Sequence, residues 1–251
     1  MKTNKDAEKS TVEETGIVKD KGFDKENWKP KTSIGKKIKS GEITDIDIVL
    51  DSGLRILEPS IVDALLQTEN DLLEVGQSKG KFGGGKRSIW RTTQKKTSEG
   101  NKPSFTTMAV VGDKNGHVGI GMGKAKETMP AREKAIRNAK LNIIKIKRGC
   151  GSWACGCREP HTIATTVEGK CGSVEIKLMP APKGTGLRVQ KECQKILRLA
   201  GIKDIYSKTR GKTSSRVNLI KACFQALKKL SIIKTKPDQE TTLGIVSGST
   251  D

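Results

Sequence analysis

Four potential metal ligands lie close together near the middle of this 251-residue sequence. They occupy a glycine-rich segment with the spacing C-x4-C-x-C-x3-H and are Cys150, Cys155, Cys157 and His161. Thiolate sulfur and imidazole nitrogen are the ligands of structural zinc, although the customary C-x2-C pair is missing. Two alternatives stay open: a structural zinc site, to which Cys171 in a neighbouring turn could contribute, or a tight loop of small residues packed around Trp153.

The chain has six cysteines, and their setting indicates thiols or metal ligands rather than disulfides. The first ten residues contain no apolar segment of the kind that begins a secretory signal, and no apolar run approaches the roughly 18 residues of a membrane helix. A reducing compartment is therefore expected. Cys193 and Cys223 share the spacing of inward-facing apolar residues and are expected to be ordinary core thiols.

A second segment that could bind a ligand is Pro180-Ala181-Pro182-Lys183-Gly184-Thr185-Gly186. Its prolines stiffen the chain and its glycines expose backbone amides before an expected helix, an arrangement that can bind anions. It is interpreted as a strand-to-helix turn, a contact to an RNA phosphate, or a small-molecule phosphate site. The glycines of Gly119–Lys124 and Gly211–Thr213 do not have the spacing of a nucleotide-binding loop.

No set of catalytic residues is recognisable, so an enzyme is not predicted. The sequence has two histidines, no Gly-x-Ser-x-Gly motif and no obvious pair of acidic residues. His117 directly follows an expected hairpin turn and is interpreted as a surface residue.

Positive charge is the strongest compositional signal. With 48 Lys+Arg against 28 Asp+Glu, the formal net charge is +20, which favours a nucleic acid partner. The excess is concentrated in residues 76–103 (+7), 124–148 (+7) and 183–234 (+12), and the remainder is net −6. Aromatic residues make up only 3%, which argues against stacking on single-stranded bases. Candidate phosphate contacts in the second and third stretches are Lys124, Lys126, Arg132, Lys183, Arg210 and Lys212.

Hydrophobic periodicity predicts an α+β protein with two small units. The expected elements of the first unit are a helix at 59–67, a strand at 72–75, a long loop at 76–103, a hairpin of strands at 105–111 and 117–123, and a helix at 128–145. In the second hairpin strand Val118, Ile120 and Met122 face one way. Gly119, Gly121 and Gly123 face the other way, which permits close approach of a helix or a phosphate chain.

The second unit is expected to contain strands at 162–168 and 173–179 around a turn at 169–172, a helix ending at Gly201, a strand at 202–206 and a helix at 216–230. The predicted organisation is a mobile N-terminal arm (1–29), an N-terminal extension (30–59), a first domain (60–148), a Gly/Cys-rich linker (149–160), a second domain (161–234) and a polar, loose tail (235–251).

Several segments resemble the universal small-subunit ribosomal protein five family. The first domain carries VVGDKNGHVGIGMGKAKE (Val110 to Glu127) and EKAIRNAKLNI (Glu133 to Ile143). The second carries GKCGSVEIKLMPAPKGTGL (Gly169 to Leu187), LRLAGIKDIYSKTRG (Leu197 to Gly211) and NLIKACFQALKKL (Asn218 to Leu230). The segments Trp28 to Ile43 and Lys147 to Cys157 resemble the archaeal branch, and the likeness extends from about Trp28 to Leu230.

The resemblance implies a fold for each domain. The first is expected to be a double-stranded-RNA-binding-like domain, with a three-stranded antiparallel sheet and one helix on its face. The second is expected to be a β-α-β-α domain, similar to a left-handed β-α-β unit of phosphate-handling proteins.

The resemblance also implies a function: a structural constituent of the small ribosomal subunit that binds rRNA, supports decoding accuracy and helps to unwind mRNA where it enters. Its implied neighbours are small-subunit proteins three, four and eight. The family's long hairpin loop corresponds to Gly76–Ser104, and the implied RNA contacts are Lys79, Lys81, Lys86, Arg87 and Arg91. There are two alternatives: a free double-stranded-RNA or chromatin-like binder outside the ribosome, and a metalloenzyme built on the cysteines.

Overall fold

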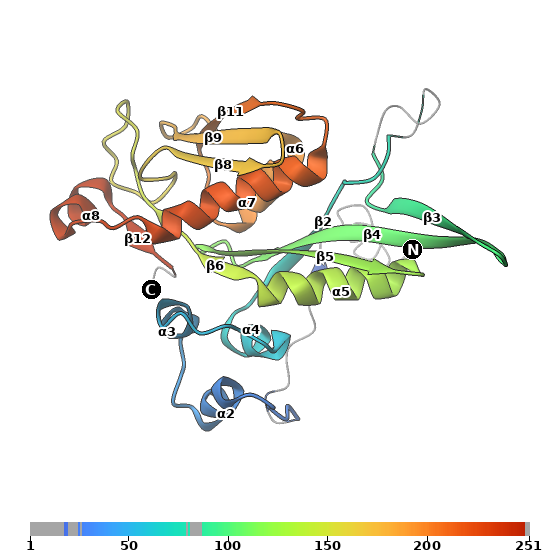
Figure 1. The fold of residues 1–251 in the computed structure, drawn as a ribbon. Coiled ribbons are helices and arrows are strands. Elements are labelled where there is room, and N and C mark those ends of the chain that lie inside the picture. Colours follow the sequence, from blue (N-terminus) through green and yellow to red (C-terminus); the bar gives the residue numbers. More distant parts are fainter. Residues whose placement is uncertain (1–17, 20–24, 26, 79, 81–86, 249–251) are drawn as a thin grey trace, which may run out of the picture.

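Two β-sheets, one in each half of the chain, organise the fold (Figure 1). The computed structural model describes residues 18–19, 25, 27–78, 80 and 87–248. The larger sheet has the strand order β1-β2-β4-β5-β6, with β3 also paired to β4. Its strands are β1 (Val18–Lys19), β2 (Glu69–Leu73), β3 (Arg91–Thr97), β4 (Gly100–Gly112), β5 (His117–Ala125) and β6 (Ile143–Lys145). The predicted α+β class is confirmed.

The predicted hairpin is the centre of the larger sheet. β4 and β5 pair antiparallel from Phe105↔Ala125 to Gly112↔Val118. In the connecting turn Lys114 and Gly116 have positive φ, 64° and 107°, whereas Asn115 is not among the described residues with positive φ. The two strands and the turn between them were therefore predicted correctly, although positive φ falls on Lys114 and Gly116.

Helix α5 (Thr128–Leu141) covers the glycine face of β5 (Figure 1). A Cβ atom at Gly119 or Gly121 would lie 2.2 Å from a backbone oxygen of α5, and one at Gly123 would lie 2.1 Å from another. The facing residues of the helix are small and fully buried: Ala131, Ala135 and Ala139. The glycines therefore admit a helix, and this face is closed to a phosphate chain.

Helix α5 is shorter than predicted. It ends at Leu141 with Asn142 as its C-cap, whereas the prediction extended it to Lys145. Residues Ile143–Lys145 instead form β6, which pairs with His117–Gly119 of β5. The β-branched pair Ile143-Ile144 suits a strand, and the edge of β5 offers it hydrogen bonds that a helix turn would not satisfy.

The long loop predicted at 76–103 is a β-hairpin from Arg91 onward, so that prediction was wrong for this part. β3 pairs with the first half of β4 from Arg91↔Thr106 to Thr97↔Gly100. Every residue of β3 except Thr97 is exposed, and Thr97 is partly buried, so no alternation of buried and exposed side chains reveals the strand. The hairpin projects away from both packed layers (Figure 1).

The smaller sheet has the order β10-β11-β9-β8. Its strands are β8 (Val167–Cys171), β9 (Val174–Pro180), β10 (Leu187–Arg188) and β11 (Ile205–Arg210). The predicted turn at 169–172 was wrong, because Gly169 lies inside β8 and a Cβ there would be 2.1 Å from the Ala222 oxygen. The turn is Gly172-Ser173, between the paired residues Cys171 and Val174.

Two helices follow in the second half: α7 (Arg216–Ile232) packs against β8 and β9 of the smaller sheet, and α6 (Lys191–Leu199) packs against the larger sheet and β10. α6 is followed by Gly201 at φ 80°, the helix stop predicted from the sequence. α7 buries Leu219, Cys223 and Leu227, in agreement with the predicted helix at 216–230. The strand predicted at 202–206 begins later, at Ile205, because the amides of Lys203 and Asp204 donate to the carbonyl of His161.

One hydrophobic core joins the two halves of the chain. The face of β4 and β5 opposite α5 contributes Val110 and Val118, and α6 contributes Ile196 and Leu197 to the same cluster. A second cluster holds the N-terminal helices α2 (Ser33–Ser40), α3 (Ile46–Asp51) and α4 (Pro59–Leu65), and includes Ile143 of β6. The predicted helix at 59–67 corresponds to α4.

The expected loose tail is ordered over most of its length. It forms α8 (Pro237–Leu243) and β12 (Val246–Ser247), and β12 pairs with β7 (Lys147–Arg148). The amide of Cys150 also donates to the carbonyl of Leu243 at 2.8 Å, so the tail contacts the cysteine-rich segment. No helix within the described ranges is long and apolar enough to span a membrane.

Candidate metal centre and basic surface

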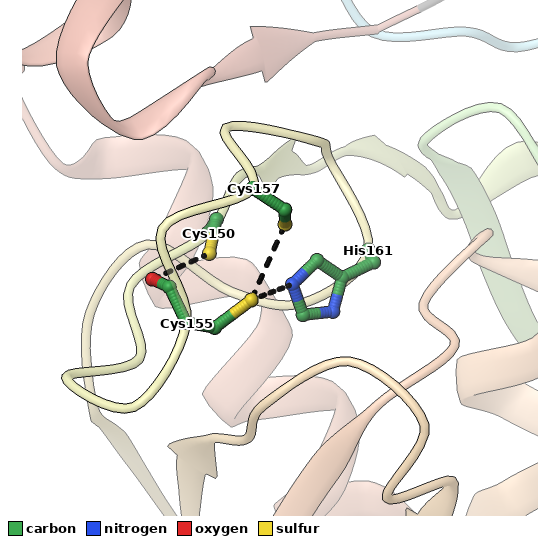
Figure 2. Close-up of side chains that lie close together, drawn as sticks. All are labelled: Cys150, Cys155, Cys157 and His161. Atoms are coloured by element: carbon green, nitrogen blue, oxygen red, sulfur yellow. Dashed lines mark hydrogen bonds between the residues drawn. The ribbon is translucent and has the colours of Figure 1, made fainter.

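The four predicted metal ligands converge on one point (Figure 2). The three sulfur atoms and one imidazole nitrogen of Cys150, Cys155, Cys157 and His161 all lie within 4.8 Å of one another. The Sγ atoms of Cys155 and Cys157 are 3.3 Å apart, and Cys155 Sγ is 3.7 Å from His161 Nε2. In a tetrahedral zinc site with Zn–S bonds near 2.3 Å, neighbouring sulfur atoms are about 3.8 Å apart. The cluster therefore has the composition and dimensions to hold a metal ion.

Backbone pairing at the base of the loop brings the ligands together. Gly149 and Thr162 exchange two hydrogen bonds, of 2.9 and 3.1 Å, which close the loop next to Cys150 and His161. Gly151 allows the returning chain to pass, since a Cβ there would lie 2.1 Å from the Ala164 oxygen. The spacing C-x4-C-x-C-x3-H thus belongs to a closed loop rather than to a helix or a simple turn.

Asp204 orients the imidazole ligand from a distant part of the chain. Its Oδ2 atom is 2.9 Å from His161 Nδ1, and its Oδ1 atom accepts the Gly186 amide at 2.8 Å. Both partners are buried, with 3% exposure for His161 and 4% for Asp204. A carboxylate at Nδ1 directs the lone pair of Nε2 toward the cysteines, which is the arrangement of many metal-bound histidines.

The cysteines differ in acidity. Hydrogen bonds from the backbone amides of Lys183 and Cys157 lower the pKa of Cys155 to about 6. Burial and the neighbouring cysteines raise the pKa of Cys150. Thiolate is the form that binds metal, so Cys155 is prepared for coordination at neutral pH.

Two details of the sequence interpretation need correction. Cys171 ends β8 and packs against the large core, and it is not part of the ligand group among the described residues. Trp153 is fully exposed at 105%, so the loop does not pack around it. Cys193 and Cys223 are completely buried core thiols, as predicted.

Two of the predicted RNA contacts lie in one cross-strand row. Arg91 pairs with Thr106, and Thr106 pairs with Lys124 on its other side. Residues directly opposite in a sheet share a face, so Arg91 and Lys124 are presented together, two strand spacings or roughly 10 Å apart. Both are exposed.

A hollow of about 440 Å³ beside the start of α7 contains Arg91 and another predicted contact, Arg87. The Arg87 Nη1 atom donates to the carbonyl of Ser214 at 3.4 Å. Arg210 ends β11 and Lys212 lies in the connection that leads to α7, and both are exposed. Residues 79, 81 and 86, the predicted contacts Lys79, Lys81 and Lys86, lie outside the described residues.

The remaining predicted contacts do not join that group. Lys126 and Arg132 flank the start of α5. Lys183 lies beside the cysteine cluster and forms an exposed 2.7 Å ion pair with Glu159. The Pro180–Gly186 segment is a loop followed by β10, and Asp204 accepts the Gly186 amide, so these amides do not open a helix as expected.

His117 is buried at 1% exposure, so its interpretation as a surface residue was wrong. Two carboxylates hold its ring. The position of His117 after a turn in the sequence did not indicate them. Sequence reasoning also missed Asp204, which is 43 residues from His161 and shares no motif with it. The basic stretch at 76–103 includes Lys95, Lys96 and Lys102. The sequence did not predict that they are exposed on a separate hairpin, β3–β4.

Comparison with known proteins finds the same family across the chain. Residues 169–239 match the family model for the C-terminal domain of ribosomal protein S5, and residues 89–147 match the model for its N-terminal domain. The small ribosomal subunit protein uS5 of Nanoarchaeum equitans is 49% identical over 225 residues, covering 89% of this chain and 96% of that protein. The corresponding protein of Methanocaldococcus jannaschii is 47% identical over 227 residues, covering 90% and 98%.

Proposed function

Because the chain belongs to the ribosomal protein S5 family, we propose that it is a structural component of the small ribosomal subunit and binds ribosomal RNA. The observation that carries the proposal is 49% identity to a small-subunit protein over 89% of the chain. Members of this family are structural proteins rather than enzymes, and incorporation into ribosomes would give the chain a cytoplasmic location.

Charge and shape supply the proposed mode of RNA binding. Lysine and arginine side chains neutralise phosphates and release counterions, which makes the affinity dependent on salt. The β3–β4 hairpin is suited to this role because it is exposed on nearly all of its surface and carries Lys95, Lys96 and Lys102. The glycine face of β5 has no part in it, because α5 covers that face.

The finer functions follow from the resemblance and are part of the proposal. They are contact with mRNA where it enters the subunit, support of decoding accuracy, and contact with small-subunit proteins three, four and eight. We also propose that the chain divides into an RNA-binding-like domain at 60–148 and a second domain at 161–234, with the cysteine-rich segment between them.

Structural zinc is the proposed ligand of the cysteine cluster. Three thiols and one imidazole match the preference of zinc, and the His161–Asp204 contact supplies the outer hydrogen bond that such sites use. With four protein ligands the ion would have no open position for substrate, which supports a structural rather than a catalytic role. The ion would hold the loop against β7 and the C-terminal residues.

Co-sedimentation tests the proposed function. The tagged protein, expressed in a related archaeal cell, is expected to sediment with small subunits and to remain bound after a high-salt wash. A protein that binds double-stranded RNA outside the ribosome would instead stay near the top of the gradient or leave the subunit in salt. That result would contradict the proposal.

A further inference from the structure

A cavity of about 760 Å³ lies between the turn of the β4–β5 hairpin and the end of α6. Four cationic residues from separate parts of the chain line it: Lys114, Arg148, Arg198 and Lys203. Glu159 is the one acidic residue among the described residues that line it. None of the predicted RNA contacts that the structure describes lines this cavity.

Arg148 at this cavity is a buried cation that has no ion-pair partner in the part of the chain that the structure describes. It is 5% exposed, and its Nη atoms donate only to the backbone carbonyls of Lys114, Asn115 and Gly248. Its Nε atom is buried and has no hydrogen-bond partner among the described residues. In the described part of the chain no carboxylate lies within ion-pair distance, and Asp113, which acts on Arg148 through its charge, is hydrogen-bonded to His117.

A charged group in the protein interior is expected to be paired, because burial removes its hydration. Carbonyl oxygens satisfy some of the guanidinium hydrogens but do not neutralise the positive charge. An anion in the adjacent cavity would do so, and phosphate is the anion whose oxygens match a guanidinium most closely.

The mouth of the cavity adds two more cations. Arg198 and Lys203 are exposed, and neither side chain forms a hydrogen bond or ion pair within the described residues. Glu159, in contrast, is paired with Lys183. No aromatic side chain of Phe, Tyr or Trp lines the described cavity, so it has no surface on which to stack a base.

We propose that this cavity binds a phosphate group of the RNA backbone, with Arg148 at its wall and Arg198 and Lys203 at its mouth. The inference rests on the proposed function and assigns a further RNA contact to it. Gly201 contributes to the site's construction, since a Cβ there would lie 2.6 Å from Arg148 Nη1 and 2.1 Å from the Lys114 oxygen.

The decisive variant is Arg198→Ala with Lys203→Ala, because both side chains are exposed and the fold does not depend on them. Arg148 is left unchanged, since its three backbone contacts make it part of the fold. Lys221→Ala with Lys228→Ala on the exposed side of α7 removes the same charge elsewhere and is the matched control.

The RNA arm measures binding of the full chain to small-subunit rRNA at several salt concentrations. The cavity variant is expected to bind about tenfold more weakly, the loss expected for one charge-assisted hydrogen bond. The slope of log affinity against log salt concentration should decrease by the amount expected for about one phosphate contact. Affinity and slope equal to those of the wild type would overturn the inference. A wild-type chain that does not bind rRNA would overturn the proposed function itself.

The phosphate arm measures the melting temperature of the free protein in inorganic phosphate and in chloride at equal ionic strength. Phosphate is expected to raise the melting temperature of the wild type and the control, but not that of the cavity variant. If the cavity variant loses this response yet binds rRNA normally, free phosphate is the ligand and the RNA assignment is wrong. If the control variant lost the phosphate response equally, the response would depend on net charge alone, and the inference would also be overturned.

Glu159→Gln provides a test with the opposite sign. Removal of the one carboxylate among the described lining residues is expected to strengthen the phosphate response and rRNA binding, because it removes repulsion and releases Lys183. A weaker phosphate response in this variant would contradict an anion site.

Discussion

The Nε2 atom of His117 lies 2.7 Å from Oδ1 of Asp47, and this contact joins α3 to the larger sheet. Nδ1 of the same ring is 2.6 Å from Oδ2 of Asp113. With a carboxylate at each nitrogen, both nitrogens donate when the ring is protonated. Lys145 lies 3.1 Å from the other oxygen of Asp47 and 3.1 Å from Asp51, so the buried imidazolium is part of a network of two cations and three carboxylates.

This network predicts that stability decreases as pH rises above neutrality. Burial opposes the charge of His117, but the hydrogen bonds and charges of Asp113 and Asp47 outweigh it and raise the pKa above its ordinary 6.5. The stabilisation is complete below about pH 6.5 and is lost as pH rises through the raised pKa. His117→Gln should cost about 3 kcal/mol at low pH and should remove this dependence.

Urea unfolding from about pH 6 to about pH 9 checks the prediction. The free energy of unfolding should fall with pH for the wild type and should be flatter for the variant. Parallel curves would show that His117 is neutral in the folded protein. At the acidic end the sign reverses, because the hydrogen bond from His117 lowers the pKa of Asp113 despite burial, and its contribution is lost as pH falls through that lowered value.

His117 also illustrates which features were accessible from the sequence. Hairpin β4–β5 and the helix stop at Gly201 were predicted because local turn chemistry and apolar alternation determine them. The contact with Asp47 spans 70 residues, and β3 has no buried side chain except the partly buried Thr97, so neither leaves a local pattern. The cysteine cluster was predicted because its ligands lie within one loop, whereas Asp204 joins them only through the fold of the second half.

Removal of metal is expected to destabilise the loop at 149–162 and the tail that contacts it. The purified protein should contain about one zinc per chain, and a chelator should lower its melting temperature. Cys155→Ser should abolish the metal content, because this thiol contacts both Cys157 and His161. Cys171→Ser is the control and should keep the metal, since Cys171 is outside the cluster. Equal metal content in Cys155→Ser and wild type would exclude the site.

Asp204→Asn is expected to weaken zinc binding about 10- to 100-fold without removing a ligand. The substitution keeps an oxygen for the Gly186 amide but removes the negative charge opposite His161 Nδ1. Competition with a chromogenic chelator measures the affinity directly. An unchanged affinity would mean that the carboxylate serves the fold alone, and comparison of melting temperatures in excess zinc would then show that structural contribution.

Gly121→Ala should destabilise the first domain strongly. The added Cβ would lie 2.2 Å from both the Ala135 oxygen and the Ala139 nitrogen, and these are backbone atoms that cannot rotate away. Separation of α5 from the sheet should cost about 3 kcal/mol or more. Gly80→Ala is the control, because a Cβ there meets no atom of the described residues within 4 Å. Equal stability of the two variants in urea would contradict the close packing.

The basic stretch at 76–103 is predicted to dominate the RNA affinity of the first domain. This stretch contains eight basic residues and one acidic residue. Neutralising Lys86, Arg87 and Arg91 should therefore lower the slope of log affinity against log salt concentration by the amount expected for as many as three phosphate contacts. Filter binding at several salt concentrations gives the slope. The control removes three charges from α7, at Lys221, Lys228 and Lys229, which are exposed in the second domain. An unchanged slope in the first variant, or an equal change in the control, would refute a dominant role for the stretch.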